Sequence, residues 1–302
     1  MSAPAPNAEW AATRELLRET EWPTPVKPGL YRGWSYDQYA ALPAVRSSDL
    51  KGFARSPAHA HHAMTHPAET AAMILGQALH VALLEPSFFE TTYVAAPALD
   101  RRTVAGKSAW SDFQAANGHR IVLKAEEMDH CRALADAALQ HPIAGPLLAA
   151  PGVNEASLVW HDAERMLACK ARLDRLCTYE GYSTIVDVKS ARDASPRGFA
   201  ADAARFGYHV QAAHYLAGAD ALAPVARRFV FLVIEKDPPH AVACYELDEM
   251  FLAAGRAERE SALVAYRNAQ ESGVWNGYPT RISTLYAPSW LKSPESIEEE
   301  TF

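Results

Sequence analysis

KARLDRLCTYEGYSTIVDVKS, residues 170–190, predicts two β-strands joined by a tight turn. Polar and apolar side chains alternate over residues 170–176, as expected of a half-buried strand, and a β-branched run predicts a second strand over residues 183–189. Glu180 and Gly181 fit a two-residue hairpin loop in which the glycine supplies a positive φ. In that register, the residue numbers of each cross-strand pair add up to 361, as in Tyr179 with Tyr182.

This register places Asp174 opposite Asp187, and Arg172 opposite Lys189. The Cβ atoms of directly opposed residues lie about 5 Å apart, which allows two carboxylates to share one hard cation such as Mg²⁺. Such a cation polarises a phosphodiester and lowers the pKa of a bound water, while a nearby lysine orients or deprotonates that water. A solvated hairpin with two alternating ion pairs has the same pattern, so the hairpin alone leaves both interpretations open.

The composition is that of an ordinary water-soluble protein of 302 residues, long enough for one domain or two. No apolar run approaches the roughly 20 residues of a membrane span, and the N-terminus lacks a secretory signal, so we expect a cytoplasmic protein without membrane contact. The net charge is −7, but the segment 293–302 contributes four glutamates and no base. Charge therefore neither excludes nor supports a nucleic-acid partner.

The four cysteines are too irregularly spaced for a zinc ribbon or an iron–sulfur cluster. They are Cys131, Cys169, Cys177 and Cys244, and no pair forms a C-x-x-C motif. We expect reduced, structural thiols.

The chain divides into an Ala- and Pro-rich extension (1–30) with a short helical stretch near 10–20, one domain (31–292) and the acidic tail (293–302). Ser47 to Asp49 and Ser56-Pro57 are typical of helix starts, and residues 70–84 predict a third helix. The remaining predicted elements are a helix at 125–140, a strand at 156–160, the hairpin, a helix at 199–222, strands at 228–236 and 241–247, and a helix at 248–270. This order predicts an α/β fold, a sheet flanked by helices after a mainly helical N-terminal region.

Two groups of histidines lie on the predicted N-terminal helices. His80, near the end of the third helix, stands alone, and a lone histidine is usually a packed or exposed side chain. The other group is a cluster of four histidines with no nearby acid or cysteine, which favours a solvated helix over a metal site. Its members are His59, His61, His62 and His66.

The helix at 199–222 carries Tyr208, Gln211 and Tyr215 in one stripe. Such a polar face could bind phosphates and stack on bases, or it could be a tyrosine-edged surface in solvent. Glu155, just before the strand at 156–160, could add a carboxylate to the hairpin site, although a surface glutamate is the simpler interpretation.

Taken together, several motifs resemble the nuclease domain of RecE-type exonucleases, a branch of the PD-(D/E)xK superfamily that includes the RecB nuclease domain. Asp174 matches the first acid of the superfamily signature, and Asp187-Val188-Lys189 matches its (D/E)-x-K motif. The segment from Gly76 to His80 resembles the G-x-A-x-H motif of the branch, and the segment from Gln211 to Tyr215 resembles its Q-x-x-x-Y motif. Further similar segments lie at 101–107, 155–157, 208–211 and 285–290, and the resemblance spans about residues 36–290 in order.

The resemblance implies a PD-(D/E)xK core, a central mixed sheet flanked by helices. It implies that Mg²⁺, or Mn²⁺ in its place, binds His80, Asp174, Asp187 and the carbonyl of Val188, and that Lys189 serves the attacking water. Gln211 and Tyr215 would position DNA, with Tyr208 and Arg172 as further DNA contacts. The basic residues available for a 5′-phosphate are Arg46, Arg55, Arg172 and Arg197.

The activity implied is 5′→3′ digestion of one strand at the ends of double-stranded DNA, leaving a 3′ single strand for a RecT-like annealing protein. Members of this branch form rings, so we expect a homo-oligomer, and the small size fits a phage recombination module. Two alternatives stay open: a RecB-like or Cas4-like single-strand nuclease, and a catalytically silent DNA-binding protein with the same fold. The cysteine spacing does not suit the iron–sulfur cluster that Cas4-like proteins usually hold.

Overall fold

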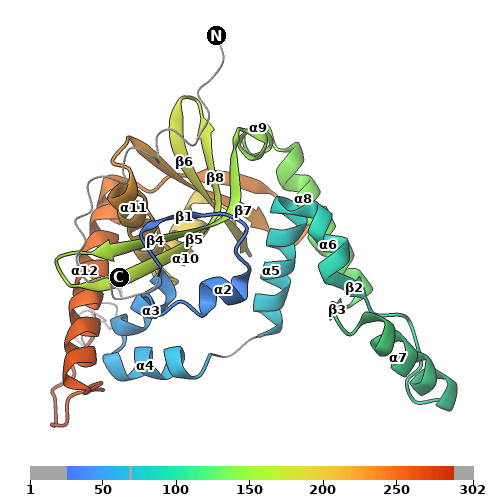
Figure 1. Ribbon diagram of the computed structural model, residues 1–302, viewed down its shortest axis with the longest axis horizontal. Helices are drawn as coiled ribbons and strands as arrows, with labels where there is room; N and C mark the ends of the chain where they lie inside the picture. The colour runs from blue at the N-terminus through green and yellow to red at the C-terminus, as the bar shows by residue number, and fades with distance from the viewer. Residues whose placement is uncertain (1–25, 68–69, 289–302) are drawn as a thin grey trace, which may run out of the picture.

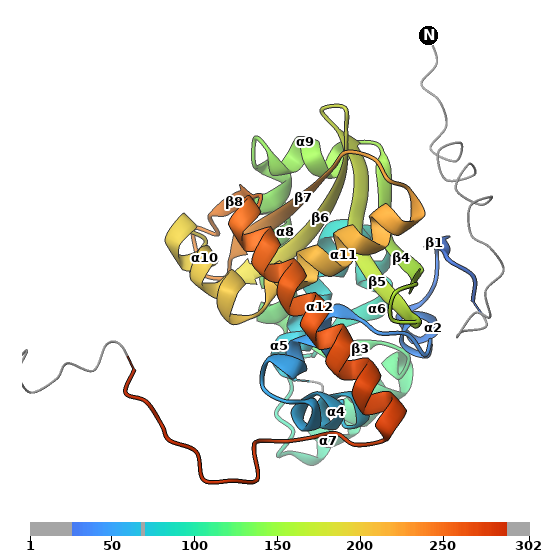
Figure 2. The ribbon, with the colours of Figure 1, turned by 90° about the vertical axis from the view of Figure 1, so that its left-hand side faces the viewer.

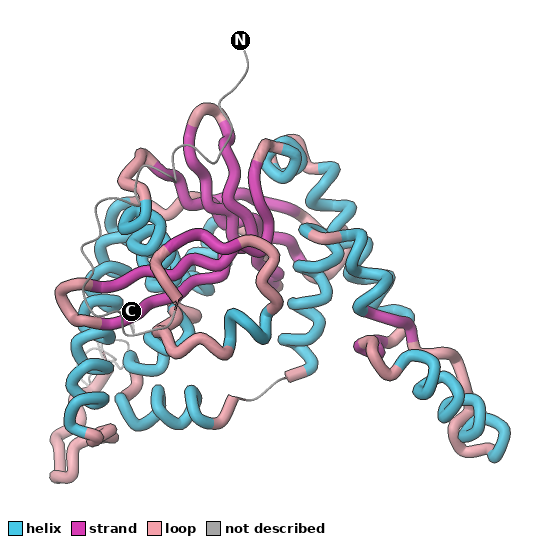
Figure 3. Tube along the Cα trace, viewed as in Figure 1, coloured by secondary structure: helices cyan, strands magenta, loops and turns pink. Residues whose placement is uncertain are grey.

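The computed structural model describes residues 26–67 and 70–288. Most of this chain surrounds a six-stranded sheet with the strand order β1-β4-β5-β6-β7-β8, and a separate two-stranded parallel sheet pairs β2 with β3 (Figure 3). The helical stretch expected near 10–20 and the acidic tail at 293–302 lie outside the described residues. The strands are β1 Gly29–Tyr31, β2 Tyr93–Ala95, β3 Ile121–Leu123, β4 Gly152–Asp162, β5 Leu167–Tyr179, β6 Tyr182–Ala191, β7 Arg227–Glu235 and β8 Val242–Tyr245.

The large sheet is mixed, because β6 and β7 run parallel while every other neighbouring pair is antiparallel. The first strand begins at Gly29, two residues before the domain start at Tyr31 that the composition suggested. The helices are α2 Tyr36–Ala40, α3 Ser47–Lys51, α4 Pro57–Thr65, α5 Ala71–Leu84, α6 Pro86–Thr92, α7 Val104–Asn117, α8 Ala125–Gln140, α9 Ala144–Ala149, α10 Pro196–Arg205, α11 Tyr208–Leu222 and α12 Glu249–Ser272.

The turn between β5 and β6 has the geometry that the sequence predicts. Glu180 and Gly181 have φ values of 50° and 83°, both in the left-handed region, as a type I′ hairpin turn requires. The strand pairs run from Tyr179 with Tyr182 to Arg175 with Val186, and each pair sums to 361. The predicted register is therefore confirmed over these pairs.

The expectation of a half-buried β5 is wrong, because helices cover both faces of the sheet. One hydrophobic core lies against α3, α10, α11 and α12, and a second lies against α5, α8 and α9, as Figures 1 and 2 show. Along β7, Phe229, Phe231 and Val233 enter the first core, whereas Val230 and Leu232 enter the second. A strand covered on both sides must pair its polar side chains internally.

Lys170 on β5 shows how one such polar side chain is satisfied. It is 3 % exposed, and its ammonium group donates hydrogen bonds at 2.7–3.0 Å to the backbone carbonyls of Tyr39, Ala40 and Leu42. These carbonyls lie at the C-terminal end of α2 and just after it, so a buried cation ties α2 to the sheet.

Two helix predictions need correction. The single helix expected at 199–222 is two helices, α10 and α11, since Gly207 between them adopts a left-handed φ of 65°. The cap of α3 is Arg46, whose backbone N–H donates to the Asp49 carboxylate, so Ser47 lies inside the helix. By contrast, the helix α8 has the bounds that its periodicity predicts.

A projection that the sequence did not predict extends from the second core. The chain leaves β2, runs outward, and returns through α7 to β3, so that α7 stands away from the sheet (Figure 1). We call residues 96–120 the arm. Among the described residues, no helix is long and apolar enough to cross a membrane.

Candidate metal-dependent nuclease site

The two predicted acids lie where β5 and β6 separate. Their pairing ends at Arg175 and Val186, and the next residue on each strand is Asp174 or Asp187. The Asp174 carboxylate accepts the backbone N–H of Val188 at 2.7 Å, which closes the fork between the strands. Both acids are within the folded body, with Asp187 only 1 % exposed.

Helix α5, which packs on the face of the sheet opposite to α11, brings His80 to this fork. Its Nδ1 lies 3.4 Å from an oxygen of Asp174, and its Nε2 donates a hydrogen bond to the carbonyl of Val188 at 3.2 Å. Burial lowers the pKa of His80, but the adjacent Asp174 carboxylate outweighs burial and raises it to about 9. Three of the four groups expected to hold a cation therefore lie together: the His80 imidazole, the Asp174 carboxylate and the Val188 backbone.

Asp187 points to the α11 side of the sheet, where two partners fix its carboxylate. Gln211 donates a hydrogen bond to one oxygen at 2.6 Å, and Lys189 forms an ion pair with the other. Burial raises the pKa of Asp187 above its usual range, although Lys189 opposes this. Burial lowers the pKa of Lys189, but Asp187 and Asp174 outweigh burial, so it is raised overall.

Glu155 also belongs to the site and is no simple surface glutamate. Its side chain is 17 % exposed, and its backbone has a φ of 51°, which is uncommon for a residue other than glycine. Its carboxylate accepts a hydrogen bond from Arg172 at 2.7 Å. Burial raises the pKa of Glu155, and so does the nearby Asp174.

The donor set fits a divalent cation. Ligand atoms of His80, Glu155 and Asp174 all lie within 4.8 Å of one another, and no other such group of His, Cys, Asp or Glu occurs among the described residues. The carbonyl of Val188 adds an oxygen donor beside them. Carboxylates, a carbonyl and one imidazole suit Mg²⁺ or Mn²⁺ better than soft metals.

Comparison with known proteins agrees with this geometry. The family described as "PDDEXK-like domain of unknown function (DUF3799)" matches residues 46–285. The chain belongs to this family. It thus has a PD-(D/E)xK nuclease fold, as the sequence motifs predict, and the expected α/β core is confirmed. The family match does not distinguish a RecE-type enzyme from other members of the superfamily.

Solved structures similar to this DUF3799 protein are distant in sequence. A crystal structure of a protein from Eubacterium rectale, named as a candidate exonuclease, has a TM-score of 0.55 at 12% identity and covers 84% of this chain and 93% of that one. A second structure, SSO0001, has a TM-score of 0.28 at 15% identity over 63% of this chain and 86% of that one. No curated protein matches the chain significantly. The first likeness supports the fold alone.

The tyrosine stripe of α11 is not a solvent face in this DUF3799 domain. Gln211 and Tyr215 are each 8% exposed, and Gln211 contacts the Asp187 carboxylate directly. Tyr208 is half-buried, and its ring lies between two cations, with the Nζ atoms of Lys51 and Lys189 at 5.2 and 4.8 Å from the ring centroid.

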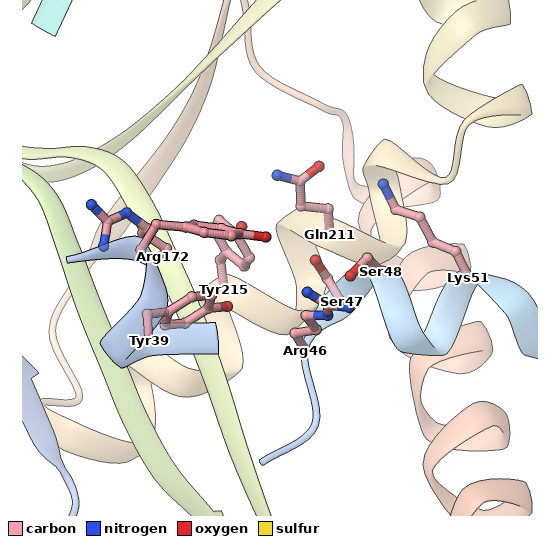
Figure 4. A pocket seen from close by; sticks show the side chains of 9 residues that line it. Tyr39, Arg46, Ser47, Ser48, Lys51, Arg172, Gln211 and Tyr215 are labelled. Carbon is pink, nitrogen blue, oxygen red and sulfur yellow. The ribbon is translucent and has the colours of Figure 1, made fainter. Parts of the chain in front are cut away.

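A cavity of about 250 Å³ is lined by Gln211, the residue that donates to Asp187, and by side chains around it (Figure 4). It contains three cationic side chains and several hydroxyl groups, from α2, α3, β5 and α11. The residues that line it are Tyr36, Tyr39, Arg46, Ser47, Ser48, Lys51, Arg172, Gln211 and Tyr215. Such a lining suits a phosphate group.

Only two of the four arginines suggested for a 5′-phosphate line the cavity. Arg46 and Arg172 line it, whereas Arg55 lies elsewhere and donates to the Tyr278 hydroxyl at 3.2 Å, and Arg197 is exposed in the first turn of α10. Arg172 does not face Lys189 across the hairpin, because β5 and β6 have already separated; it donates to Glu155 and to the carbonyl of Trp34.

Lys51 is the cationic cavity residue that sequence reasoning missed, and Tyr36, Tyr39, Ser47 and Ser48 were not expected in the site either. Burial, together with the neighbouring Lys189, lowers the pKa of Lys51 to about 8. The sequence shows only that Lys51 belongs to a short helix, Ser47–Lys51, which lies more than a hundred residues before the hairpin. Nothing in the local pattern relates that helix to the acids.

The cluster of four histidines on α4 and after it serves packing. His61 stacks on Trp275 with ring centroids 4.4 Å apart, and His62 stacks on His66 at 4.5 Å. His59 lies 2.6 Å from the Ser56 hydroxyl that caps the helix.

Proposed function

We propose that this chain is a Mg²⁺-dependent exonuclease that degrades the 5′-terminated strand of linear duplex DNA and leaves a 3′ single-stranded end. The observation that carries this proposal is the contact of His80 with both Asp174 and the Val188 carbonyl, beside the buried pair of Asp187 and Lys189. Five groups from two strands and a remote helix converge on one point, a costly arrangement unless a cation and a reaction use it.

His80, Asp174, Asp187 and the Val188 carbonyl would hold the metal. Ligand atoms of His80, Asp174 and Glu155 already lie within 4.8 Å of one another, whereas Asp187 would have to exchange its ion pair with Lys189 for the metal. When bound, the ion polarises the scissile phosphate and lowers the pKa of an attacking water. Mn²⁺ would replace Mg²⁺, since both prefer oxygen ligands.

Lys189 and Gln211 complete the reaction centre. The Lys189 ammonium group, buried beside Asp187, orients the attacking water and balances charge on the phosphate. Gln211 fixes the orientation of the Asp187 carboxylate through its 2.6 Å hydrogen bond. Tyr208, with its ring against Lys189, and Tyr215, in the wall of the cavity, are placed to contact the DNA strand.

The cavity lined by Gln211 supports the choice of a 5′ end. Arg46, Lys51 and Arg172 bring three cationic side chains to it, of which Arg46 is paired with Asp49 and Arg172 with Glu155. A terminal phosphate carries close to two negative charges near neutral pH and would gain more from such a site than a backbone phosphodiester.

Further parts of the proposal concern partners. The resemblance to RecE-type enzymes supports a homo-oligomeric ring around the duplex, a RecT-like annealing protein that takes the 3′ strand, and a role in phage recombination. Action in the cytoplasm is proposed from the sequence, in which we expect neither a secretory signal nor a membrane span. A single-strand nuclease of the RecB or Cas4 kind remains the alternative substrate class.

The polarity can be tested with linear duplexes labelled at one 5′ or one 3′ end, carrying either a 5′-phosphate or a 5′-hydroxyl. We expect early loss of the 5′ label, late loss of the 3′ label, and faster digestion of the phosphorylated duplex. Faster digestion of single strands would favour the alternative, and cleavage of a closed circle would show an endonuclease. The Lys51→Gln variant should remove most of the preference for the phosphorylated end.

A further inference from the structure

The arm, residues 96–120, is tied to the rest of the fold at its base, where Arg120 donates hydrogen bonds to the backbone carbonyls of Glu90 and Thr91. None of its residues belongs to either hydrophobic core of the described chain. In α7 only Gly106 is buried, and Val104 is 87% exposed. At about 1.5 Å per residue, a helix of this length projects about 21 Å.

The outer end of the arm is strongly basic. The run from Arg101 to Lys107 contains three cationic side chains and no acid, in a chain with a net charge of −7. Arg101, Arg102 and Lys107 are all exposed. We call this run the arm tip.

Local hydrogen bonds connect the arm tip to Asp100 and to the first turn of α7. Asp100 accepts the backbone N–H of Arg102 through its side chain and the hydroxyl of Thr103 through its carbonyl, both at 3.0 Å. Thr103 in turn accepts the N–H of Gly106 at 3.0 Å. A Cβ atom at Gly106 would lie 2.0 Å from the carbonyl oxygen of Asp100, so the loop and the first turn of α7 pack without space between them.

Aromatic packing fixes one of the cations. The guanidinium group of Arg101 lies 3.9 Å from the centroid of the Trp110 ring, and Trp110 stacks on Phe113. An exposed loop ordered in this way loses conformational entropy that no buried surface offsets. The order is understandable if the arm presents its three cations to a partner.

We propose that the arm tip binds the sugar–phosphate backbone of duplex DNA outside the active site. This inference rests on the proposed function, because it adds a second contact to the same substrate. Duplex DNA carries one negative charge per about 1.7 Å of helix axis, which matches three cations within seven residues. The binding would be independent of base sequence and would keep the duplex attached between successive cleavages.

The test measures DNA binding rather than cleavage. Fluorescence anisotropy in EDTA would compare a short duplex, which the active site alone can cover, with a longer one that also reaches the arm. For the variant Arg101→Gln/Arg102→Gln/Lys107→Gln, we expect unchanged binding of the short duplex and about 10-fold to 100-fold weaker binding of the longer one. The slope of log affinity against log salt concentration should become shallower by about 2 to 3, since each phosphate contact contributes about 0.9.

Two further variants separate charge from shape. Gly106→Ala keeps every charge but displaces the loop of Asp100, so it should weaken binding of the longer duplex by several-fold. Arg256→Gln removes an exposed charge from α12, far from the arm in sequence, and should change neither affinity nor slope. Circular dichroism would show that all variants are folded.

An unchanged affinity and salt slope in the triple variant would overturn the inference. The same holds if the triple variant shifts the oligomeric state in light scattering while DNA binding stays intact, because the arm would then contact a second copy. If the longer duplex binds through the arm but no condition gives cleavage, the proposed nuclease function fails and the arm contact stands. If the wild type neither binds DNA in EDTA nor cleaves it with Mg²⁺, both fail.

Discussion

At the residue scale, the sequence motif predicted which acids and lysine form the site, but the hairpin register did not predict their arrangement. The turn at Glu180 and Gly181 fixes the pairing only as far as Arg175 and Val186, so the expected cross-strand pair of Asp174 with Asp187 does not form. Glu155 and Lys51 were not predictable in the same way. Each reaches the site through tertiary packing, and the left-handed φ of Glu155 has no sequence signature.

Gln211 is the residue whose replacement best tests the local chemistry. In Gln211→Leu, the buried Asp187 carboxylate loses a hydrogen bond of 2.6 Å and gains none, so the free energy of unfolding should fall by about 1–3 kcal/mol. The nuclease rate should fall at least about 10-fold, because the carboxylate is no longer oriented. Urea denaturation and initial rates would measure the two effects.

The matched control is Gln140→Leu, at the exposed last residue of α8. It makes the same chemical change without a buried partner, so both quantities should stay near the wild-type values. Equal effects in the two variants would show that Gln211 has no special role at Asp187.

At the element scale, periodicity predicted long isolated helices well and closely joined ones poorly. The bounds of α8 follow from its apolar period, whereas α10 and α11 read as one helix because apolar residues continue through Phe206 and Tyr208. Only the left-handed Gly207 separates them, and glycine inside a helical pattern is ambiguous. The arm was missed because an exposed helix has no apolar stripe.

The contact between α11 and α12 gives a prediction at this scale. A Cβ atom at Gly255 would lie 2.2 Å from the carbonyl oxygen of His209, so Gly255→Ala must force the two helices apart. We expect the free energy of unfolding to fall by about 1–3 kcal/mol in urea denaturation.

Gly76→Ala on α5 is the opposite case, since nothing lies within 4 Å of the position that the new methyl group would take. Helix propensity and the smaller entropy of the unfolded chain should raise stability by about 0.4–1 kcal/mol. A Gly255→Ala variant at least as stable as the wild type would contradict the helix contact, and a destabilised Gly76→Ala variant would contradict the open space at that position.

At the scale of the whole molecule, a sheet covered on both faces explains why buried polar groups are numerous. Asp187, Lys170 and His214 all lie under helices and find partners in the protein. The sequence predicted the sheet and its flanking helices from the order of elements, but not this burial. Alternating polar residues on β5 look like a solvent face until helices from distant parts of the chain cover it.

His214 makes the fold sensitive to acid. Burial lowers its pKa to about 3, against an ordinary value of 6.5, and its Nε2 donates to the carbonyl of Lys170 at 3.2 Å. Below pH 6.5 the unfolded chain binds a proton that the folded chain does not, so stability is lost as the pH falls. From pH 7 to pH 5, this residue should cost about 2 kcal/mol.

The His214→Gln variant keeps a side-chain N–H for the Lys170 carbonyl but has no proton to bind. Its stability loss between pH 7 and pH 5, from urea denaturation at each pH, should be smaller than that of the wild type by about 2 kcal/mol. Parallel losses in the two proteins would mean that other groups determine the acid sensitivity.

The central claim is that the fork between β5 and β6 is a metal-dependent nuclease centre. Release of acid-soluble nucleotides from linear, 5′-phosphorylated duplex DNA tests it directly, with Mg²⁺ or EDTA, for the wild type and for Lys189→Ala. We predict release by the wild type with Mg²⁺, none with EDTA, and a rate at least about 100-fold lower for a folded Lys189→Ala variant. No release by the wild type with Mg²⁺, or equal rates for the two proteins, would contradict the claim.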